Sequence, residues 1–533
     1  MTAKLSIQHQ LLMIWMISIV IGLSLSPVLM SIGTIGITVQ WLVDIARQKI
    51  KPWVFITFAA TRNWVILYLL LVLAMLWSSN WSFGANDLRI KLPLLLLSIT
   101  LPSYLTDLKK EKRRIIEGAF IFGIVLSAVV SILLVHNAMP LAHWVVSKKL
   151  SPSQIREYSV FTSHVRMGLF SALGIALLWS YPFHQLWKTI FRFGISLFLI
   201  YYLVLIESAT GLFLVVVAAV FFIVRYLKLR FSYRYKLWTL VTLSGLLIIG
   251  LFYIIRHFQD YYTIQPHQIP LAKTKNGNAY VSQLDHPQIE NGYLVHLNIC
   301  EKELIPSWNN RSTLAYHQKD LSGGDIDQTL IRYLSSMGLP KDQQAVESLS
   351  VEQVKEIEMG IPNCRYAEMN GLERRLDKIF FEYQMIQLGD APNGYSLFQR
   401  FIYWQNAIDL ILEHWILGTG TGDLNDTIQA GYAKDNKGLL PQYQLRTHNQ
   451  YLTIILTLGL LGLVFCIVFL YNIIKAAKRC SLIASIFVMI ILFSMVTEDT
   501  LETQAGITFI AFFTAWWLGA PLWSSEKWRP RLA

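Results

Sequence analysis

The sequence predicts an all-α polytopic membrane protein of about 12 transmembrane helices, with a large mixed α/β-hairpin loop domain between spans 9 and 10. Three observations predict this class. Hydrophobic residues make up 54% of the chain and charged residues only 15%, whereas soluble proteins average about 25% charged residues. The apolar residues also form runs long enough to cross a hydrocarbon layer of about 30 Å. A single long polar region, residues 257–449, interrupts these runs.

Twelve apolar segments follow one another along the chain. The first two are joined through Pro27, and we expect two short crossings because proline breaks a helix interior. The segments are 10–25, 27–44, 63–79, 88–105, 115–137, 165–181, 190–206, 208–224, 237–255, 450–471, 481–497 and 504–522.

The formal net charge of +12 divides unevenly along the chain. Residues 257–449 hold 16 Lys+Arg and 23 Asp+Glu, a balance of −7, and the remainder of the chain therefore carries +19. The large polar region is acidic, whereas nucleic-acid binding needs a basic patch on an accessible folded surface. We therefore expect no nucleic-acid partner.

Basic residues in short loops set the orientation, because cytoplasmic loops are enriched in Lys and Arg. With a cytoplasmic N-terminus, most basic residues outside the large loop lie on the cytoplasmic side, including the clusters Lys109–Arg114 and Arg225–Lys236. The start shows no small-residue cleavage site and is interpreted as an uncleaved anchor. Both termini are then cytoplasmic and the large loop is external. The predicted parts are residues 1–256 with spans 1–9, the loop domain 257–449, residues 450–523 with spans 10–12, and a tail at 524–533.

The external region contains two kinds of predicted secondary structure. Short β-type runs at Ala279–Leu284 and Gly292–Ile299 flank an E-N-G at 290–292, which indicates a hairpin. Capping and amphipathic patterns predict helices at Asp325–Gly338, Ser350–Gly360, Gly371–Ile386 and Leu397–His414. Two external cysteines, Cys300 and Cys364, could pair in an oxidising compartment, although their spacing does not establish it.

Ionisable residues at the ends of spans are candidate functional residues, because burying a charge in a bilayer costs about 2.5–3.5 kcal/mol. They gather at the outer ends of the predicted spans. The arginines could instead be interfacial anchors, His164 a polar helix-end residue, and His448 with Asn449 a helix cap. The glycine-rich stretch Gly418–Gly422 is interpreted as a flexible turn, since no clear strand precedes it. The outer residues are His164, Arg166, Glu207, Ser208, Arg446, His448, Glu498, Asp499 and Glu502.

Several motifs together resemble the O-antigen ligase and O-antigen polymerase superfamily. They are the segment 396–432, which begins S-L-F-Q-R-F-I-Y-W-Q-N-A-I-D-L, the H-N-Q-Y-L at 448–452, the S-H-V-R at 163–166 and the T-E-D-T-L-E-T-Q-A-G at 497–506. The order of parts is also similar: about nine spans, a large loop, the H-N-x-Y-L helix and two more spans.

The resemblance implies a glycosyltransferase of the bacterial inner membrane that works on its periplasmic face. Its donor would be a glycan on undecaprenyl diphosphate, and a ligase would pass that glycan to lipid A–core. The resemblance implies neither a cofactor nor a metal. The partners are then the donor, the acceptor and membrane lipids. The residues do not indicate an oligomeric state.

The resemblance also assigns roles. His448 would be the catalytic base, and histidine suits this work because its unperturbed pKa is near 6.5. Arg166 would bind the donor diphosphate through charge-assisted hydrogen bonds. The family's second arginine is absent, because Ala209 stands where it is expected. Arg400 or Arg446 would substitute. Residues that would orient these groups or bind glycan are His164, Ser208, Asn449, Tyr451, Glu498 and Glu502.

Other activities are compatible with the same residues. An O-antigen polymerase or a protein O-oligosaccharyltransferase needs the same donor site and base. A transporter of lipid-linked glycans belongs to another class, and it typically places polar groups near the bilayer midplane within repeated halves. Here the polar groups lie at the outer ends and no repeat is visible, which favours an enzyme.

Overall fold

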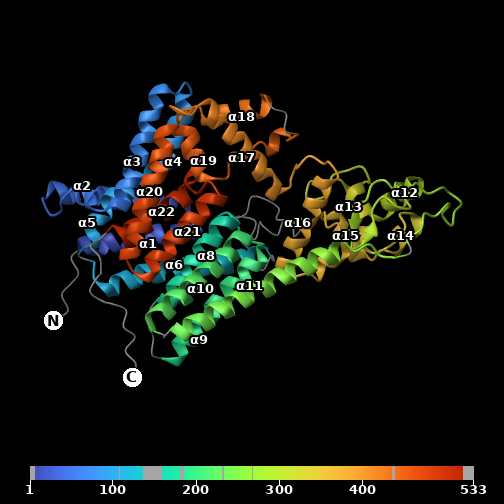
Figure 1. Cartoon of the computed structure of the whole chain (residues 1–533), viewed down its shortest axis with the longest axis horizontal. Helices are drawn as coiled ribbons and strands as arrows, with labels where there is room; N and C mark the ends of the chain where they lie inside the picture. The colour runs from blue at the N-terminus through green and yellow to red at the C-terminus, as the bar shows by residue number, and fades with distance from the viewer. Residues whose placement is uncertain are drawn as a thin grey trace.

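Within the residues that the structure describes, each apolar run predicted from the sequence is mainly helical in the computed structural model (Figure 1). The structure describes residues 7–106, 108–135, 159–180, 185–230, 233–266, 268–434 and 438–519, so the predicted tail at 524–533 lies outside the described residues. The apolar helices are α1 (Ile7–Leu25), α2 (Pro27–Ala46), α3 (Ala59–Leu73), α4 (Trp81–Thr100), α5 (Pro102–Leu105), α6 (Lys110–Val135), α8 (His164–Ser180), α9 (Leu186–Leu205), α10 (Ala209–Arg230), α11 (Tyr233–Tyr262), α19 (Gln450–Leu458), α20 (Leu460–Arg479), α21 (Leu482–Thr497) and α22 (Gln504–Leu518).

The length and composition of these helices identify a helical multi-pass membrane protein. Within the described residues, seven segments are long and apolar enough to cross a membrane, and α8, α10, α21 and α22 are shorter apolar helices. The prediction of two helices around Pro27 is confirmed: α1 ends at Leu25, and Ser26 caps α2 through its side chain. The figure of about 12 crossings stays a prediction from the sequence.

The bundle is organised around its last helix. Large side chains of α22, including Phe509, Phe512, Phe513 and Trp516, are almost completely buried. A helix that is apolar on every side belongs in the interior of a bundle. α22 packs against α4 and α3, while α8, α10 and α21 pack against one another. This arrangement brings the start of α8, the α9–α10 turn and the α21–α22 turn to neighbouring positions.

The predicted span 450–471 is two helices, because the chain breaks at Gly459. This residue has φ +56° and ψ −133°, a backbone conformation that is essentially restricted to glycine. The last carbonyl groups of α19 find hydrogen-bond donors in the glycine-rich stretch. The amides of Thr419 and Gly420 donate to the carbonyls of Leu456 and Thr457 at 2.9 and 3.0 Å. Residues 418–422 are therefore a packing turn that closes the end of α19.

Residues 263–395, here called the outer domain, extend away from the bundle (Figure 1). They have their own apolar core, built around Leu304, Trp308 and Leu330. The helices are α12 (Glu301–Arg311), α13 (Ile326–Ser336), α14 (Gln343–Ser348), α15 (Val351–Glu358) and α16 (Gly371–Gln387). α17 (Ser396–Glu413) and α18 (Leu424–Lys434) follow it and return to pack beside α19, where Leu456 joins their apolar cluster.

The predicted hairpin is present. β1 (Ile289–Glu290) pairs antiparallel with β2 (Tyr293–Leu294), and Asn291 and Gly292 form the turn with positive φ angles of 51° and 84°. Two consecutive positive φ values are typical of the tight turns that match strand twist. The other β-type run is not a strand, because Ala279 and Val281 make only isolated bridges. The helices predicted at 325–338, 350–360, 371–386 and 397–414 are present as α13, α15, α16 and α17.

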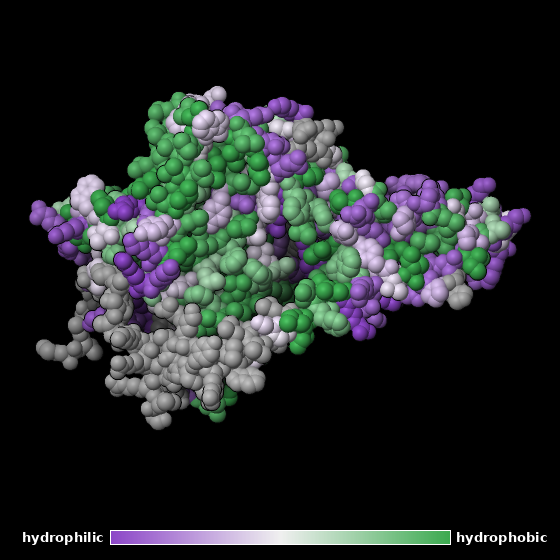
Figure 2. Space-filling model, in the orientation of Figure 1, coloured by the Kyte–Doolittle hydropathy of each residue, from purple (hydrophilic) through white to green (hydrophobic). Residues whose placement is uncertain are grey.

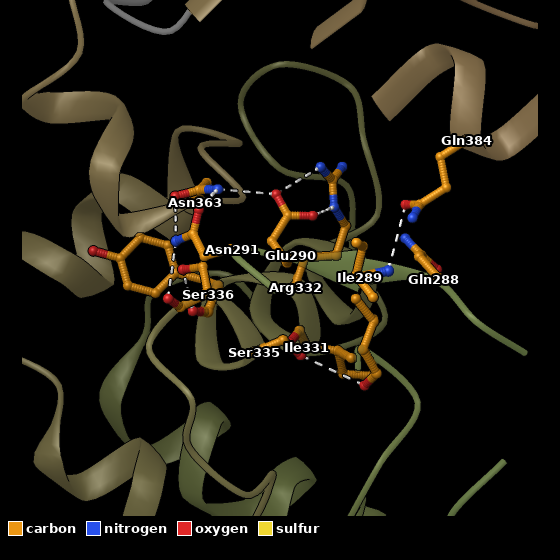
Figure 3. A network of polar contacts seen from close by, with 12 residues as sticks. Gln288, Ile289, Glu290, Asn291, Ile331, Arg332, Ser335, Ser336, Asn363 and Gln384 are labelled. Carbon is orange, nitrogen blue, oxygen red and sulfur yellow. Dashed lines mark hydrogen bonds and ion pairs between the residues drawn. The ribbon is translucent and has the colours of Figure 1, made fainter. Parts of the chain in front are cut away.

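A buried polar network fixes the hairpin to α13 and α16 (Figure 3). Arg332 of α13 donates to both carboxylate oxygens of Glu290 at 3.1 and 3.2 Å, and its guanidinium lies 3.7 Å from the ring centroid of Phe381 on α16. Gln384 of α16 accepts from the backbone amide of Ile289 at 3.4 Å. A bidentate charge pair that excludes water in this way holds its partners in one orientation. α16 is therefore attached firmly to the hairpin and to α13.

The cysteines do not form a bridge. Cys300 and Cys364 are both free, and the thiol of Cys364 lies 3.7 Å from the carbonyl oxygen of Ser336. Cys300 is buried at the start of α12, where burial raises the pKa of its thiol. The disulfide that the sequence left open is thus not formed in the structure.

Candidate active site

The segment before α19 holds His448 in an unusual backbone conformation. Its φ is +48°, which non-glycine residues adopt uncommonly and which the surroundings must stabilise. The carboxylate of Asp499 does so by accepting from the His448 amide at 2.8 Å and from the hydroxyls of Thr447 and Thr453 at 3.1 and 2.7 Å. From the other side, Tyr432 of α18 donates to the carbonyl of Leu445 at 2.9 Å. Residues 445–449, here called the histidine loop, are thus held by the α21–α22 turn and by α18.

Glu498 joins this histidine to an arginine. One carboxylate oxygen lies 3.3 Å from Nδ1 of His448, and the other accepts from Nη2 of Arg400 at 2.6 Å. Burial raises the pKa of Glu498, but the His448 hydrogen bond and the positive charge of Arg400 lower it by more, so its net pKa is below the ordinary value. The carboxylate therefore stays ionised, and its contact with Nδ1 leaves Nε2 as the ring nitrogen available for a proton from elsewhere.

The imidazole is also positioned by an aromatic ring. Tyr403, one turn after Arg400 on α17, stacks on His448 with ring centroids 5.6 Å apart and an interplanar angle of 24°. The hydroxyl of Tyr403 donates to the carbonyl of Tyr443 at 2.8 Å. Burial raises the pKa of Tyr403 to about 12, so the phenol stays neutral. Helix α17 therefore supplies both the ring that supports His448 and the arginine on Glu498.

Glu502 is the centre of a second, deeper cluster. Its carboxylate accepts from Lys91 of α4 at 2.8 Å, from Arg446 at 2.5 Å and from Gln450 at 3.2 Å. Burial raises the pKa of Glu502, but the charges of Lys91 and Arg446 lower it further, to about 2. Lys91 also pairs with Asp87 one helical turn earlier. A cavity of about 10 Å³ adjoins these groups, roughly the space of one water molecule.

Lys91 and Asp87 are the residues that sequence reasoning missed. Asp87 lies in the first half of α4, beside the segment predicted as an apolar span, and Lys91 lies near the middle of the helix, within that segment. Their i, i+4 spacing was the available signal. The sequence places three acids and no basic residue within the turn 498–502. The structure instead gives each acid its own partners, drawn from α4, α17 and the histidine loop.

Arg166 lies at the start of α8, near Glu498. Its Nη1 donates to the hydroxyl of Ser163 at 3.1 Å, while Nε is buried without a hydrogen-bond partner among the described residues. The charges of both Arg166 and His164 interact with the Glu498 carboxylate. An arginine with a buried unsatisfied donor is suited to an anionic ligand, because leaving such a donor unpaired costs about 1–3 kcal/mol.

Three of the predicted residues have structural contacts. Ser208 donates to the carbonyl of His164 at 3.1 Å and so joins α10 to α8. Asn449 caps α19 by accepting from the amides of Tyr451 and Leu452, as the helix-cap interpretation expected. Tyr451 donates to the carbonyl of Leu492 in α21 at 3.3 Å. These contacts position the loop and helices around His448.

The site as a whole combines an acid–histidine pair with several arginines near the N-terminal ends of α8, α17 and α19. Figure 2 shows a hollow with hydrophilic surface between the bundle and the outer domain. Among the described residues, no group of three or more His, Cys, Asp or Glu is arranged to hold a metal ion. The arrangement suits a reaction in which a base takes a proton close to a bound anion.

The fold and these residues define a class: a multi-pass helical membrane protein with a histidine–carboxylate–arginine site at one end of the bundle. Residues 371–467, from the start of α16 into α20, match the family model described as O-antigen ligase. This match confirms the resemblance seen in the sequence and supports membership of the O-antigen ligase superfamily, whose members are glycosyltransferase-like enzymes. No curated protein in the comparison matches the chain.

Proposed function

We propose that the protein is an O-antigen ligase of the bacterial inner membrane. It transfers a glycan from undecaprenyl diphosphate to a hydroxyl of lipid A–core on the periplasmic face. In this reaction the acceptor oxygen bonds to the anomeric carbon, the bond from that carbon to the diphosphate breaks, and undecaprenyl diphosphate leaves. The acceptor proton passes to a base and then to water.

The observation that carries the proposal is the shared carboxylate of Glu498. It contacts Nδ1 of His448 and an Arg400 donor at once, and its charge also acts on Arg166. A base and two cations are thereby gathered around one point. A histidine base next to an arginine-lined anion site is what transfer from a diphosphate donor requires.

Within this site the residues divide by role. Nε2 of His448 accepts the proton of the acceptor hydroxyl, and Glu498 orients the ring and stabilises the imidazolium that forms. Arg166 and Arg400 bind the diphosphate. Arg446 is held by Glu502 and its guanidinium lies over the ring of Phe83, so it is better placed to support the histidine loop than to bind the donor.

The test is transfer by the purified protein from an undecaprenyl diphosphate glycan. Separate reactions contain lipid A–core, a Ser/Thr peptide, or no second acceptor. We expect glycan on lipid A–core, and its loss in His448→Ala and Arg166→Ala. The matched control is His317→Ala, an exposed histidine of the outer domain whose ring meets Tyr316 edge to face at an interplanar angle of 83°.

The other outcomes identify other members of the superfamily. Growth of the lipid-linked glycan without a second acceptor would assign a polymerase, and glycan on the peptide would assign a protein O-oligosaccharyltransferase. Either result would contradict the ligase assignment while leaving the roles of His448 and Arg166 intact. Full activity of both alanine variants would contradict the mechanism itself.

A further inference from the structure

Helix α16 places basic side chains against the turn between α9 and α10. Nε of Arg374 lies 3.4 Å from Oε1 of Glu207, and Nζ of Lys378 lies 3.1 Å from Oε2. Glu207 is almost completely buried and has φ +49°. The turn itself offers no cation, since Ser208 and Ala209 follow. The positive charge at this turn therefore comes entirely from α16 within the described residues.

The ion pairs of Arg374 and Lys378 with Glu207 are not both needed to hold α16 in place. The helix is already held by the hydrogen bond from Tyr262 to the Phe380 carbonyl at 3.0 Å and by the network around Gln384 (Figure 3). At its first residue, Gly371 approaches α9 so closely that a Cβ would lie 2.1 Å from the carbonyl oxygen of Val204. α16 thus has a fixed position that does not depend on both ion pairs.

This position borders the candidate active site on two sides. On one side, Ser208 of the α9–α10 turn contacts the first residue of α8, two residues before Arg166. On the other side, Nη2 of Arg375 donates to the hydroxyl of Ser396 at 3.0 Å, at the start of the helix that carries Arg400. α16 therefore lies between the elements that carry the two proposed donor arginines.

Basic side chains from three helices meet in this region. They are Arg166 of α8, Arg374, Arg375 and Lys378 of α16, and Arg400 of α17. Their acidic partners include Glu207, Glu382 and Glu498, and the charge of Lys378 also acts on Asp377. Cations gathered from several helices suit an anionic ligand such as a diphosphate.

We propose that Arg374 and Lys378 of α16 are further donor-binding residues, which contact the diphosphate from the side of the outer domain. This inference rests on the proposed function. Lys378 is the more exposed of the two, at 38% of its side chain against 19%. Its ammonium is a point charge on a flexible stem, so it can turn toward a phosphate oxygen while staying near Glu207. Glu207 keeps both cations in place when the site is empty.

Binding of farnesyl diphosphate to the full-length protein in detergent tests this proposal, with farnesol as the uncharged control. We expect Lys378→Met to weaken farnesyl diphosphate binding about tenfold, as the loss of a charge-assisted hydrogen bond implies. Lys378→Arg should bind nearly as well as the unaltered protein. The matched control is Lys319→Met, an exposed outer-domain lysine paired with Asp325.

Glu207→Gln separates ligand binding from attachment of the helix. If the cations bind diphosphate, removing the competing carboxylate should leave binding equal or tighter. If they only attach α16, Glu207→Gln should weaken binding as much as Lys378→Met, which would overturn the proposal. Should Lys378→Met fail to fold, the double variant Glu207→Gln/Lys378→Met removes both members of that ion pair. Arg374 then keeps the hydrogen bond from Nη1 to the carbonyl of Tyr366 at 3.1 Å.

The remaining outcomes distinguish this inference from the proposed function. If Arg166→Ala abolishes binding while Lys378→Met and Arg374→Met bind like the unaltered protein, α16 is not part of the donor site and the proposed function stands. If the unaltered protein binds farnesyl diphosphate no better than farnesol, the donor assignment fails and this inference fails with it.

Discussion

At the scale of single residues, the candidate site depends on one carboxylate that contacts two partners. Glu498 orients His448 through Nδ1 and holds Arg400 with its second oxygen. The base and the anion site are therefore coupled, because a change in the carboxylate alters the ring orientation and the position of the guanidinium together.

Glu498→Gln is expected to lower the rate of glycan transfer about 100-fold, because the neutral amide neither stabilises the imidazolium nor holds Arg400. The measurement is the single-turnover rate with saturating donor. Glu413→Gln is the matched control, since Glu413 forms an exposed ion pair with Lys434. A rate within twofold of the control would remove Glu498 from the mechanism.

The sequence predicted part of this group of residues and missed another part. Arg166 and His448 stood out because they are polar residues beside apolar runs. Lys91 did not, because its partner Glu502 is 411 residues away and the pairing exists only after folding. Arg374 and Lys378 lie on an amphipathic helix, where basic residues are typical of a solvated face.

At the scale of elements, the break between α19 and α20 determines where the histidine loop lies. Gly459 allows the break, and the turn 416–420 supplies its hydrogen bonds. The sequence predicted one continuous span here because the apolar run is uninterrupted. The break at Gly459 depends on one glycine and on hydrogen bonds to a distant turn, and neither changes the hydrophobic pattern of the sequence.

Gly459→Ala should destabilise the protein by about 1–3 kcal/mol, because alanine disfavours this backbone conformation and its Cβ would lie 2.5 Å from the amide of Gly418. Gly118→Ala in α6 is the control, since a Cβ there meets nothing within 4 Å. Thermal unfolding in detergent should show a lower midpoint for the first variant only. Equal midpoints would contradict the role given to Gly459.

A buried lysine makes the outer domain sensitive to pH. Lys341 is 3% exposed and donates to the carbonyls of Leu294 and Leu297 at 3.3 and 3.0 Å. Burial lowers the pKa of Lys341 to about 7, against an unfolded value of about 10.4. Between these values the unfolded chain binds the proton and the folded chain does not. The free energy of unfolding should therefore rise as pH increases from 7 to 10.

Hydrogen exchange of residues 294–300 at pH 6.5 and pH 9, corrected for the intrinsic rate, measures this effect. The unaltered protein should be better protected at the higher pH, and Lys341→Met should remove most of the difference. Protection that falls with pH in the unaltered protein would show that the lysine is charged in the folded state.

At the scale of the whole molecule, the fold class was accessible from the sequence because hydrophobic runs dictate membrane helices directly. The tight hairpin was also accessible, since Asn291 and Gly292 favour its backbone conformation. The strand expected at Ala279–Leu284 was wrong, because its residues pair only singly with neighbouring segments. The way in which α17 and α18 return to the bundle depends on long-range packing that local patterns do not contain.

The predicted orientation of the molecule rests on its charge distribution and has a direct test. In a background without native cysteines, Lys319→Cys in the outer domain should react with a membrane-impermeant maleimide in cells whose outer membrane is permeabilised. Lys478→Cys, near the end of α20, should react only after the inner membrane is opened. The reverse pattern would place the active site in the cytoplasm and contradict the assignment of donor and acceptor.

The central claim is that His448 acts as a base on the glycan acceptor. The most direct measurement is the single-turnover transfer of glycan from undecaprenyl diphosphate to lipid A–core by His448→Ala, compared with His317→Ala. We expect the transfer rate of His448→Ala to be lower by about 10²–10⁴-fold, the usual contribution of general base catalysis, while donor binding is unchanged. Equal rates in the two variants would contradict it.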